Sequence, residues 1–399
     1  MNNAEIIDLA HRNMVDIYGC MPIAFVRGHG SYLFDADGNR YLDFFCGLAV
    51  TSLGHGHPRV VRAIKEQAEK LTHVSNVFHT EPTARLAERL ATRFGGGRVF
   101  FGNSGAEANE AAIKLARRWG HKDGGGRYEI IATLGSFHGR TLATLSATGQ
   151  EKYHQGFQPL VPGFRLVPFD DIEAFERAIH DETVAVMVEP IQGEGGVVTP
   201  HADYLKRLRD FCDRRGLLLI LDEIQTGVGR TGKFFAFEHT GIKPDIVTLA
   251  KALAGGIPIG AMIAKNEVAS AFTPSSHGTT FGGNPVACSA ALAVLDVIEQ
   301  EEVLTNATSV GAYLLERLRE IANRSGKVVE VRGLGMIIGV VLKGDPRPVV
   351  DACLKEKLLV NGTAGNVLRL LPPLNLTRAD ADIGLGIIEN ALRSAPVAP

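Results

Sequence analysis

One segment stands out in the sequence: Asp245-Ile246-Val247-Thr248-Leu249-Ala250-Lys251-Ala252-Leu253-Ala254-Gly255-Gly256. Its first part is apolar and β-branched, which predicts a buried strand that ends near Lys251 and opens into a glycine-rich loop. Open α/β sheets bind their ligands at the carboxyl ends of strands. Burial there favours the neutral, nucleophilic form of an amine, as a Schiff-base lysine requires. A lone lysine more often reaches past apolar surface to solvent, so this interpretation depends on the other segments.

Composition indicates a globular protein with more than one domain. The chain has 399 residues, of which 45% are hydrophobic and 22% charged, and a formal net charge of -2. This length exceeds the usual single core, and the charge gives no reason to expect nucleic acid or an anionic membrane as a partner. The five cysteines contain no CxxC pair, so a reducing cytoplasm fits best. The first residues do not resemble a signal peptide, and no apolar run reaches membrane-spanning length.

Periodicity divides the chain into three parts. Residues 1–60 contain a weak amphipathic helix and a hairpin around the turn sequence Asp35-Ala36-Asp37-Gly38-Asn39. Residues 61–285 alternate between short apolar strands and helices, which predicts a large domain with a mostly parallel central sheet flanked by helices. Residues 286–399 predict a smaller α+β domain, on which the hairpin is expected to pack. The strands expected in the large domain are 99–101, 129–132, 184–188, 217–221 and 245–249.

Candidate binding segments follow several of these strands. Ser104-Gly105-Ala106-Glu107 begins a helix, and Ser104 and Glu107 have the spacing of a capping box. The segment is either a well-capped helix or an anion site in which main-chain N–H groups hold a phosphate. No Gly-Lys-Ser/Thr follows, so it is not a Walker motif. His55 and His57 lack carboxylate or cysteine partners at suitable spacing, so no metal site is predicted.

Further strand ends carry an acid, an aromatic ring and an arginine. Asp222 is placed either to keep a cofactor pyridine nitrogen protonated or to cap the next helix. Phe137 could lie on a planar cofactor, and Arg140 could hold a carboxylate in a bidentate fork. Paired glutamates follow strand 184–188, and residues 277–285 form a polar, glycine-rich loop. Such convergence on one sheet edge is what a phosphate-bearing pyridine aldehyde needs.

These motifs resemble a known family. The run Leu221-Asp222-Glu223-Ile224-Gln225-Thr226-Gly227-Val228-Gly229-Arg230-Thr231-Gly232-Lys233, followed by residues 244–251, is similar to the class III (subgroup II) pyridoxal-phosphate aminotransferases of fold type I. The similarity extends from Pro22-Ile23 to Arg369-Leu370-Leu371-Pro372-Pro373-Leu374. It implies an α/β fold type I transferase, a cytoplasmic homodimer with a shared active site, and pyridoxal 5'-phosphate as cofactor.

The resemblance also implies a role for each matched residue. Lys251 forms the Schiff base and moves the proton, Asp222 pairs with the pyridine nitrogen, and Gln225 bonds the phenolic oxygen. Further cofactor contacts are expected from Gly105, Ala106, Phe137, Glu223, Ile224 and, from the neighbouring subunit, Thr280. Arg140 and Thr279 are expected to contact the substrate carboxylate that is remote from the reacting amine. Arg369 is expected to bind the α-carboxylate of glutamate. Glu194 is expected to neutralise Arg369 when an ω-amine enters instead. Ala106 stands where many relatives have threonine.

The implied reaction moves the δ-amino group of N-acetylornithine to 2-oxoglutarate, giving N-acetylglutamate 5-semialdehyde and glutamate. An ornithine, succinylornithine or 4-aminobutyrate aminotransferase would share every motif. A non-catalytic α/β protein that binds a phosphate ligand is the alternative from another class. Against it, no GxGxxG follows a strand, and the pair Asp222 and Lys251 would have no use.

Replacement of Lys251 tests the central expectation. We expect the purified protein to be yellow and its chromophore to be reducible by borohydride. Lys251→Ala should abolish both the reducible band and transamination, because the variant has no amine to form the Schiff base. Visible spectra before and after borohydride measure this, and a colourless wild-type protein or an unchanged variant would contradict it.

Overall fold

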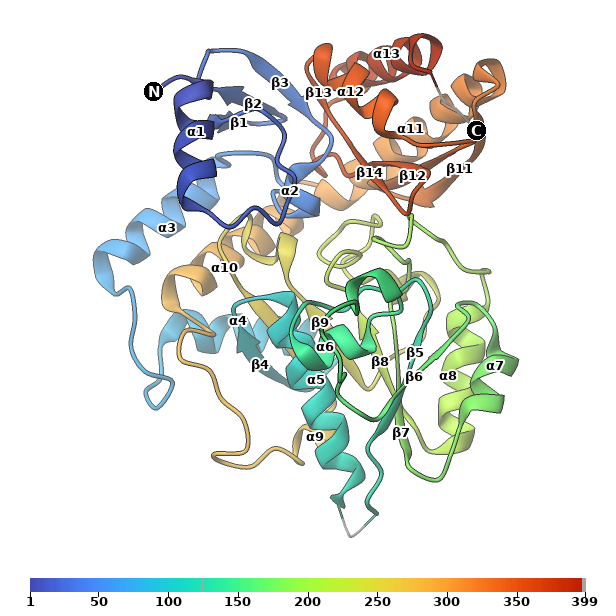
Figure 1. The fold of residues 1–399 in the computed structure, drawn as a ribbon. Coiled ribbons are helices and arrows are strands. Elements are labelled where there is room, and N and C mark those ends of the chain that lie inside the picture. Colours follow the sequence, from blue (N-terminus) through green and yellow to red (C-terminus); the bar gives the residue numbers. More distant parts are fainter. Residues whose placement is uncertain (123–124, 397–399) are drawn as a thin grey trace.

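The structure is a computed structural model that describes residues 1–122 and 125–396. A seven-stranded sheet lies at the centre of its lower part as drawn in Figure 1. Its strands run in the order β4-β10-β9-β8-β7-β5-β6. Their bounds are β4 Arg98–Gly102, β5 Glu129–Thr133, β6 Phe164–Val167, β7 Thr183–Val188, β8 Leu218–Asp222, β9 Ile246–Leu249 and β10 Gly260–Ala264. The five strands expected in this region are β4, β5, β7, β8 and β9.

The predicted mostly parallel sheet is confirmed. Strands β6, β5, β7, β8 and β9 are parallel neighbours, whereas β10 runs antiparallel to both β4 and β9. Both faces of the sheet are apolar: in β8, Leu219 and Leu221 join one buried cluster, and Leu218 and Ile220 join another. This burial on both faces explains why the strands are continuous apolar runs rather than alternating ones.

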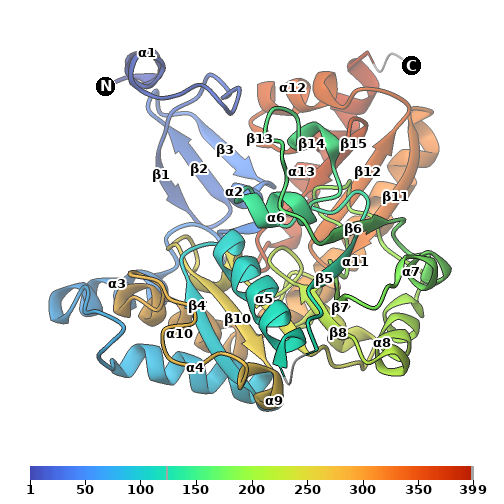
Figure 2. The ribbon, with the colours of Figure 1, turned by 60° about the horizontal axis from the view of Figure 1, so that its bottom comes forward.

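Helices cover the sheet, and Figure 2 shows α5 lying along it. Ser104 caps α5, its Oγ accepting a hydrogen bond from the main-chain N–H of Glu107 at 3.2 Å. The Glu107 carboxylate in turn accepts from the N–H of Asn103 at 2.6 Å. Helix α8 ends at Gly216, which has a left-handed backbone conformation, as the sequence predicts.

The helices around the central sheet are α3 Pro58–Lys70, α4 Glu81–Arg93, α5 Gly105–Gly120, α6 Leu142–Ala147, α7 Ile172–Ala178, α8 Tyr204–Arg215, α9 Asn266–Ala269 and α10 Pro285–Gln300. Short 3-10 turns lie at Glu151–Tyr153, Ala236–His239 and Lys251–Ala254.

Two smaller sheets lie in the upper part of Figure 1. The first joins β1 Phe25–His29, β2 Tyr32–Asp35, β3 Arg40–Asp43 and β13 Leu358–Leu359; the second has the order β11 Val328–Leu334, β12 Ile337–Leu342, β15 Val367–Leu370 and β14 Asn361–Thr363. The predicted hairpin is confirmed as the antiparallel pair β2 and β3. Because β13 pairs parallel with β3, the two ends of the chain share a sheet. The remaining helices are α1 Asn3–Asn13, α2 Cys46–Ala49, α11 Val303–Ser325, α12 Arg347–Lys355 and α13 Arg378–Ser394.

The junction between the three parts is closely packed. Helix α10 packs against α3 and α4. Residues 286–300 therefore pack on the middle part of the chain, and they also connect it to the C-terminal part. Arg230 is buried at the junction and donates from Nη1 to the main-chain oxygen of Met336 at 3.0 Å and from Nη2 to Ser52 Oγ at 2.7 Å. One side chain therefore ties together a loop of the middle part, the turn after β11 and the N-terminal part.

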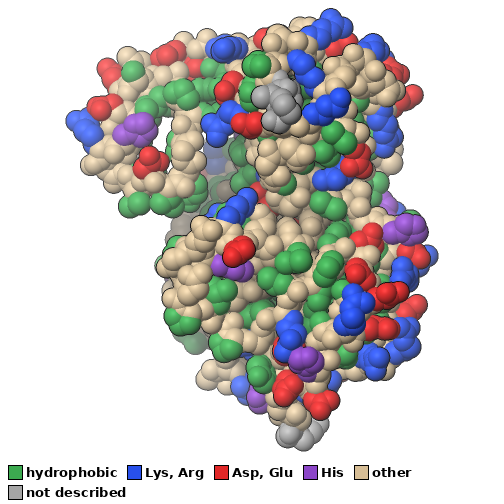
Figure 3. Space-filling view, turned by 45° about the vertical axis from the view of Figure 1, so that its right-hand side comes forward, with side chains coloured by type: hydrophobic (Ala, Val, Ile, Leu, Met, Phe, Trp, Pro, Cys, Tyr) green, Lys and Arg blue, Asp and Glu red, His purple; other side chains and the backbone are tan. Residues whose placement is uncertain are grey.

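The surface carries charges of both signs, which Figure 3 shows spread over one face, with a waist between the upper and lower parts. Within the described ranges no helix is long and apolar enough to cross a bilayer. The same residues contain no group of three histidines, cysteines or carboxylates arranged to hold a metal. All five cysteines are free thiols.

Gly260, the first residue of β10, allows the strand to approach the start of α5. A Cβ at this position would lie 2.1 Å from the main-chain oxygen of Ser104. We expect Gly260→Ala to destabilise the fold by about 1–3 kcal/mol because the backbone at the start of α5 must shift. The matched control is Gly386→Ala on the exposed face of α13, where a Cβ meets nothing within 4 Å and a stabilisation of about 0.5–1 kcal/mol is expected. Denaturant unfolding of both variants measures this; equal effects would contradict it.

Candidate active site

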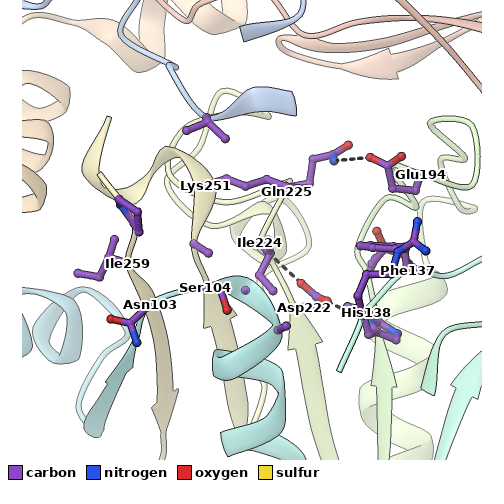
Figure 4. A pocket seen from close by; sticks show the side chains of 18 of the residues that line it. Asn103, Ser104, Phe137, His138, Glu194, Asp222, Ile224, Gln225, Lys251 and Ile259 are labelled. Atoms are coloured by element: carbon purple, nitrogen blue, oxygen red, sulfur yellow. Dashed lines mark hydrogen bonds and ion pairs between the residues drawn. The ribbon is translucent and has the colours of Figure 1, made fainter. Parts of the chain in front are cut away.

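A cavity of about 420 Å³ opens at the carboxyl ends of β8 and β9. Asp222 is the last residue of β8, and Lys251 lies two residues beyond the end of β9. Both side chains line this cavity (Figure 4). The other lining residues include Asn103, Ser104, Gly105, Ala106, Phe137, His138, Arg140, Glu189, Glu194, Ile224, Gln225 and Ile259. The acid and the lysine singled out in the sequence thus share one site.

Three donors hold the Asp222 carboxylate in a buried position. Its Oδ2 accepts from Asn109 Nδ2 at 2.7 Å and lies 2.8 Å from His138 Nδ1, and its Oδ1 accepts from the main-chain N–H of Ile224 at 3.0 Å. Asn109 is itself oriented by Thr248, whose hydroxyl donates to Asn109 Oδ1 at 2.7 Å. A chain of hydrogen bonds therefore runs from β9 through α5 to the acid at the end of β8 and fixes its direction.

The start of α5 forms one wall of the cavity. Gly105 and Ala106 are its first two residues, and the N–H groups of a first helical turn have no partner within their helix. A Cβ on Gly105 would lie 2.8 Å from Cδ1 of Ile224, so a side chain here would displace Ile224 from its place in the cavity wall. The arrangement suits an anion, because the exposed N–H groups and the positive end of the helix dipole point at it.

Lys251 has an unusual backbone and a perturbed amine. Its φ is +43°, a left-handed conformation that is uncommon for residues other than glycine and is found at functional sites. Burial lowers the pKa of its ammonium below the ordinary value, and the nearby Glu194 carboxylate opposes this only in part. The neutral amine is therefore more accessible near neutral pH than that of a solvated lysine.

Glu194, Gln225 and Arg369 form a connected group beside Lys251. Arg369 Nη1 donates to Glu194 Oε1 at 2.7 Å and to Gln225 Oε1 at 3.2 Å, and Gln225 Nε2 donates to Glu194 Oε1 at 3.2 Å. Burial of Glu194 by itself would raise its pKa, but the charges of Arg369 and Lys251 and these hydrogen bonds hold the pKa at about 2. The carboxylate is thus charged throughout the working pH range and neutralises the guanidinium.

Two apolar side chains and an arginine complete the cavity. Phe137 comes from the loop after β5 and Ile224 from the loop after β8, and both line the space beside Asp222. Arg140 lies on the same loop as Phe137 and is exposed at the cavity mouth. The site therefore offers an aromatic and an aliphatic surface for a flat ring, and a cation toward solvent.

Some predicted site residues do not line this cavity. Glu223 is not among the lining residues: its carboxylate accepts from the main-chain N–H groups of Ala236 and Phe237 at 2.6 and 2.9 Å, so its side chain braces the loop after β8. Arg369 lies fully buried behind Glu194. Thr279 contacts Asn103 at 3.4 Å, and Thr280 faces a second cavity of about 220 Å³.

Sequence reasoning missed three residues around the acid. Asn109 and His138 bond Asp222, and Glu189 Oε2 accepts from the main-chain N–H of Phe137 at 3.0 Å. Burial raises the pKa of Glu189 to about 7. The signal for Asn109 was present, because it is a polar residue on the apolar face of α5 beside Ala108 and Ala112; its partner on another strand was not predictable from periodicity.

Comparisons with known proteins agree with this geometry. The profile of the family Aminotransferase class-III matches residues 15–392. The chain belongs to the class-III aminotransferase family. It is 49% identical over 386 residues to the acetylornithine aminotransferase of Methanocaldococcus jannaschii, covering 96% of each chain. It is 48% identical over 389 residues to that of Caldanaerobacter subterraneus subsp. tengcongensis, covering 97% of this chain and 99% of the relative.

Solved structures show the same fold for this class-III aminotransferase. The ornithine aminotransferase of Toxoplasma gondii, reported with partial occupancy of PLP at its active site, has a TM-score of 0.95 and 35% identity over 99% of this chain and 95% of its own. The acetylornithine aminotransferase of Elizabethkingia anophelis has a TM-score of 0.89 and 32% identity over 98% and 99%. The predicted fold class and family are therefore confirmed, and the protein is a pyridoxal-phosphate-dependent transaminase.

The residues of this aminotransferase fit pyridoxal phosphate. The start of α5 suits the phosphate, and a side chain at Gly105 would displace Ile224 beside it. The buried Asp222 carboxylate suits a protonated ring nitrogen, and the amine of Lys251 suits an aldehyde. Each part of the cofactor thus has a chemical counterpart on the cavity wall.

Asn109 gives a test of how Asp222 is held. Asn109→Leu removes a hydrogen bond to the charged carboxylate, and such a bond is worth about 1.5–3 kcal/mol. We therefore expect the variant to bind pyridoxal phosphate about 10- to 150-fold more weakly. Thr248→Val removes only the hydroxyl that orients Asn109 and should weaken binding less. Titration of the apoprotein with cofactor, followed by the visible band, measures both variants. Unchanged affinity in a folded Asn109→Leu protein would contradict the role of this hydrogen-bond chain.

Proposed function

We propose that this aminotransferase transfers the δ-amino group of N-acetylornithine to 2-oxoglutarate, yielding N-acetylglutamate 5-semialdehyde and glutamate, as a step of arginine biosynthesis. The observation that carries the proposal is the buried ion pair between Glu194 and Arg369 beside Lys251. The names of the relatives at 46–49% identity support the choice of acylated amine. Ornithine, succinylornithine and 4-aminobutyrate are the alternative donors.

The cofactor supplies an aldehyde carbon that takes up amines and a ring that delocalises an electron pair. Gly105 and Ala106 would hold the phosphate through main-chain N–H groups. Asp222 would keep the ring nitrogen protonated, and Phe137 and Ile224 would enclose the ring. Gly105 and Ala106 begin α5 and Asp222 ends β8, whereas Phe137 and Ile224 lie in the loops that follow β5 and β8, so the site is built on the ends of the central strands.

Lys251 is the proton carrier of the proposed mechanism. Its amine is partly freed of its charge by burial, so Nζ can accept the proton from the amine-bearing carbon of the substrate. The same atom would hold that proton until it is delivered, and it would act in the reverse direction in the second half-reaction. Leu253 and Ala254 pack the segment that carries it into the core, so the amine stays at the cavity wall.

Glu194 and Arg369 explain how one site accepts two different substrates. With the pair closed, the charge of Arg369 is neutralised, so it does not repel the amine end of N-acetylornithine when that end enters. With Glu194 turned away, Arg369 is free to bind the α-carboxylate of glutamate or 2-oxoglutarate in a bidentate fork. Arg140 holds the carboxylate remote from the reacting amine in the first half-reaction.

The site also suggests its assembly. Thr280 faces away from the cavity of its own chain and is exposed, so we propose that it contacts the cofactor phosphate of a second subunit, with Thr279 beside the substrate. Exposed apolar residues nearby, among them Val77, Phe78 and Phe281, give such a homodimer a surface to bury. The free cysteines agree with a cytoplasmic location.

A panel of amine donors with 2-oxoglutarate tests the proposed substrate. We expect kcat/KM for N-acetylornithine to exceed that for ornithine by about tenfold or more, equivalent to ~1.4 kcal/mol, because ornithine would bring a charged α-ammonium near Arg140. Succinylornithine and 4-aminobutyrate complete the panel, and steady-state kinetics of purified holoenzyme give the comparison. Equal or better use of ornithine or 4-aminobutyrate would assign the enzyme to that substrate instead.

A further inference from the structure

Tyr153 lies behind the residues that line the cavity mouth. It ends the 3-10 turn Glu151–Tyr153, which follows α6, and it is half-buried. The guanidinium carbon of Arg140 lies 4.0 Å from the centre of the Tyr153 ring, compared with 5.6 Å from the centre of the Phe137 ring. Tyr153 also meets Phe137 edge to face, with ring centres 5.7 Å apart and an interplanar angle of 79°.

The neighbours of Tyr153 hold its ring in place. Gln150 Nε2 donates to the main-chain oxygens of Gly135 and Ser136 at 3.3 and 3.1 Å. On the other side, His154 is buried and its Nε2 lies 2.9 and 2.8 Å from the main-chain oxygens of Leu145 and Thr148. The turn is therefore fixed both to the loop that carries Phe137 and to α6, so its ring is a rigid surface.

Arg140 needs such a surface. It is exposed, and among the residues that the structure describes no carboxylate lies within ion-pair distance of it. A long exposed side chain without a partner samples many rotamers, and holding it costs conformational entropy when a ligand binds. The negative face of an aromatic ring attracts a guanidinium and orients it without neutralising its charge. Arg140 thus remains available to a carboxylate.

We propose that Tyr153 is a positioning residue that orients Arg140 toward the substrate carboxylate and so contributes to the choice of amine donor. This inference rests on the proposed function, in which Arg140 binds the carboxylate remote from the reacting amine. Tyr153 acts through Arg140 and does not touch the substrate. Its effect should therefore appear only with donors that carry this carboxylate.

Two substrates that differ by that carboxylate alone provide the test. N-acetylputrescine is N-acetylornithine without its carboxylate and retains the reacting amine. In Tyr153→Leu holoenzyme we expect kcat/KM for N-acetylornithine to fall by about 2- to 30-fold, mainly through KM, which is the range of a cation–π contact. The value for N-acetylputrescine should stay within about twofold of wild type. Tyr153→Met serves as a second variant if the leucine variant is poorly folded.

Control variants separate this role from general damage. Tyr153→Phe keeps the ring and should retain the wild-type preference, and Lys152→Ala removes the other cation near the ring, at 4.8 Å, without affecting Arg140. In an Arg140→Gln background, Tyr153→Leu should cause no further loss, since residues that act through one another are not additive.

The possible outcomes are distinct. Equal losses for both amines in Tyr153→Leu would overturn the inference, because the ring would then act through Phe137 and the cofactor. A loss that persists in the Arg140→Gln background would overturn it as well. If Arg140→Gln itself leaves the preference for N-acetylornithine over N-acetylputrescine unchanged, the proposed role of Arg140 fails. If Arg140→Gln removes the preference and Tyr153→Leu does not, only the role of Tyr153 fails.

Discussion

The pairing of β8 with β9 is the constraint on which the site depends. In this parallel pair Asp222 lies opposite Thr248, so both strands end at the same level of the sheet. Lys251 follows three residues after Thr248 and therefore reaches the same cavity as Asp222. The hydrogen bonds from Thr248 to Asn109 and from Asn109 to Asp222 reinforce this register from the adjacent helix. A shift of one residue would turn the acid to the other face of the sheet.

The two charges of the Glu194–Arg369 pair are buried together. The charges of Arg369 and Lys251 and the hydrogen bonds from Arg369 and Gln225 offset the lost hydration of the Glu194 carboxylate and keep its pKa low. Removing one member of a buried pair is costly because the other charge remains unpaired. The pair is therefore stable as a unit, and in the mechanism we propose a substrate carboxylate would take the place of Glu194 as the partner of Arg369.

Most of the fold and of the site could be predicted because the signals were local. Apolar runs marked β4, β5, β7, β8 and β9, and polar residues after them marked the cavity. Strand β10 was not expected, since Gly260-Ala261-Met262-Ile263-Ala264 is short and rich in small residues. The direction of the Glu223 side chain was not evident from the sequence: successive side chains at a strand end point to opposite faces, so the neighbour of Asp222 turns to the main chain of Ala236 and Phe237. Asn109 stood out as a polar residue on an apolar helix face, but its bond to Asp222, that of His138 to the same acid, and the contact of Tyr153 with Arg140 cross the fold and leave no pattern along the chain.

The amino-acid order alone was enough to establish five of the strands of the central sheet, the helix start at Ser104 and the polar residues at the strand ends, because these follow from local polarity, backbone preference and spacing. Which of those residues meet was settled only when the chain was folded. Packing brought Arg369 behind Glu194, aimed Glu223 away from the cavity and laid Arg140 against Tyr153, since such contacts depend on the distances between elements far apart in the chain.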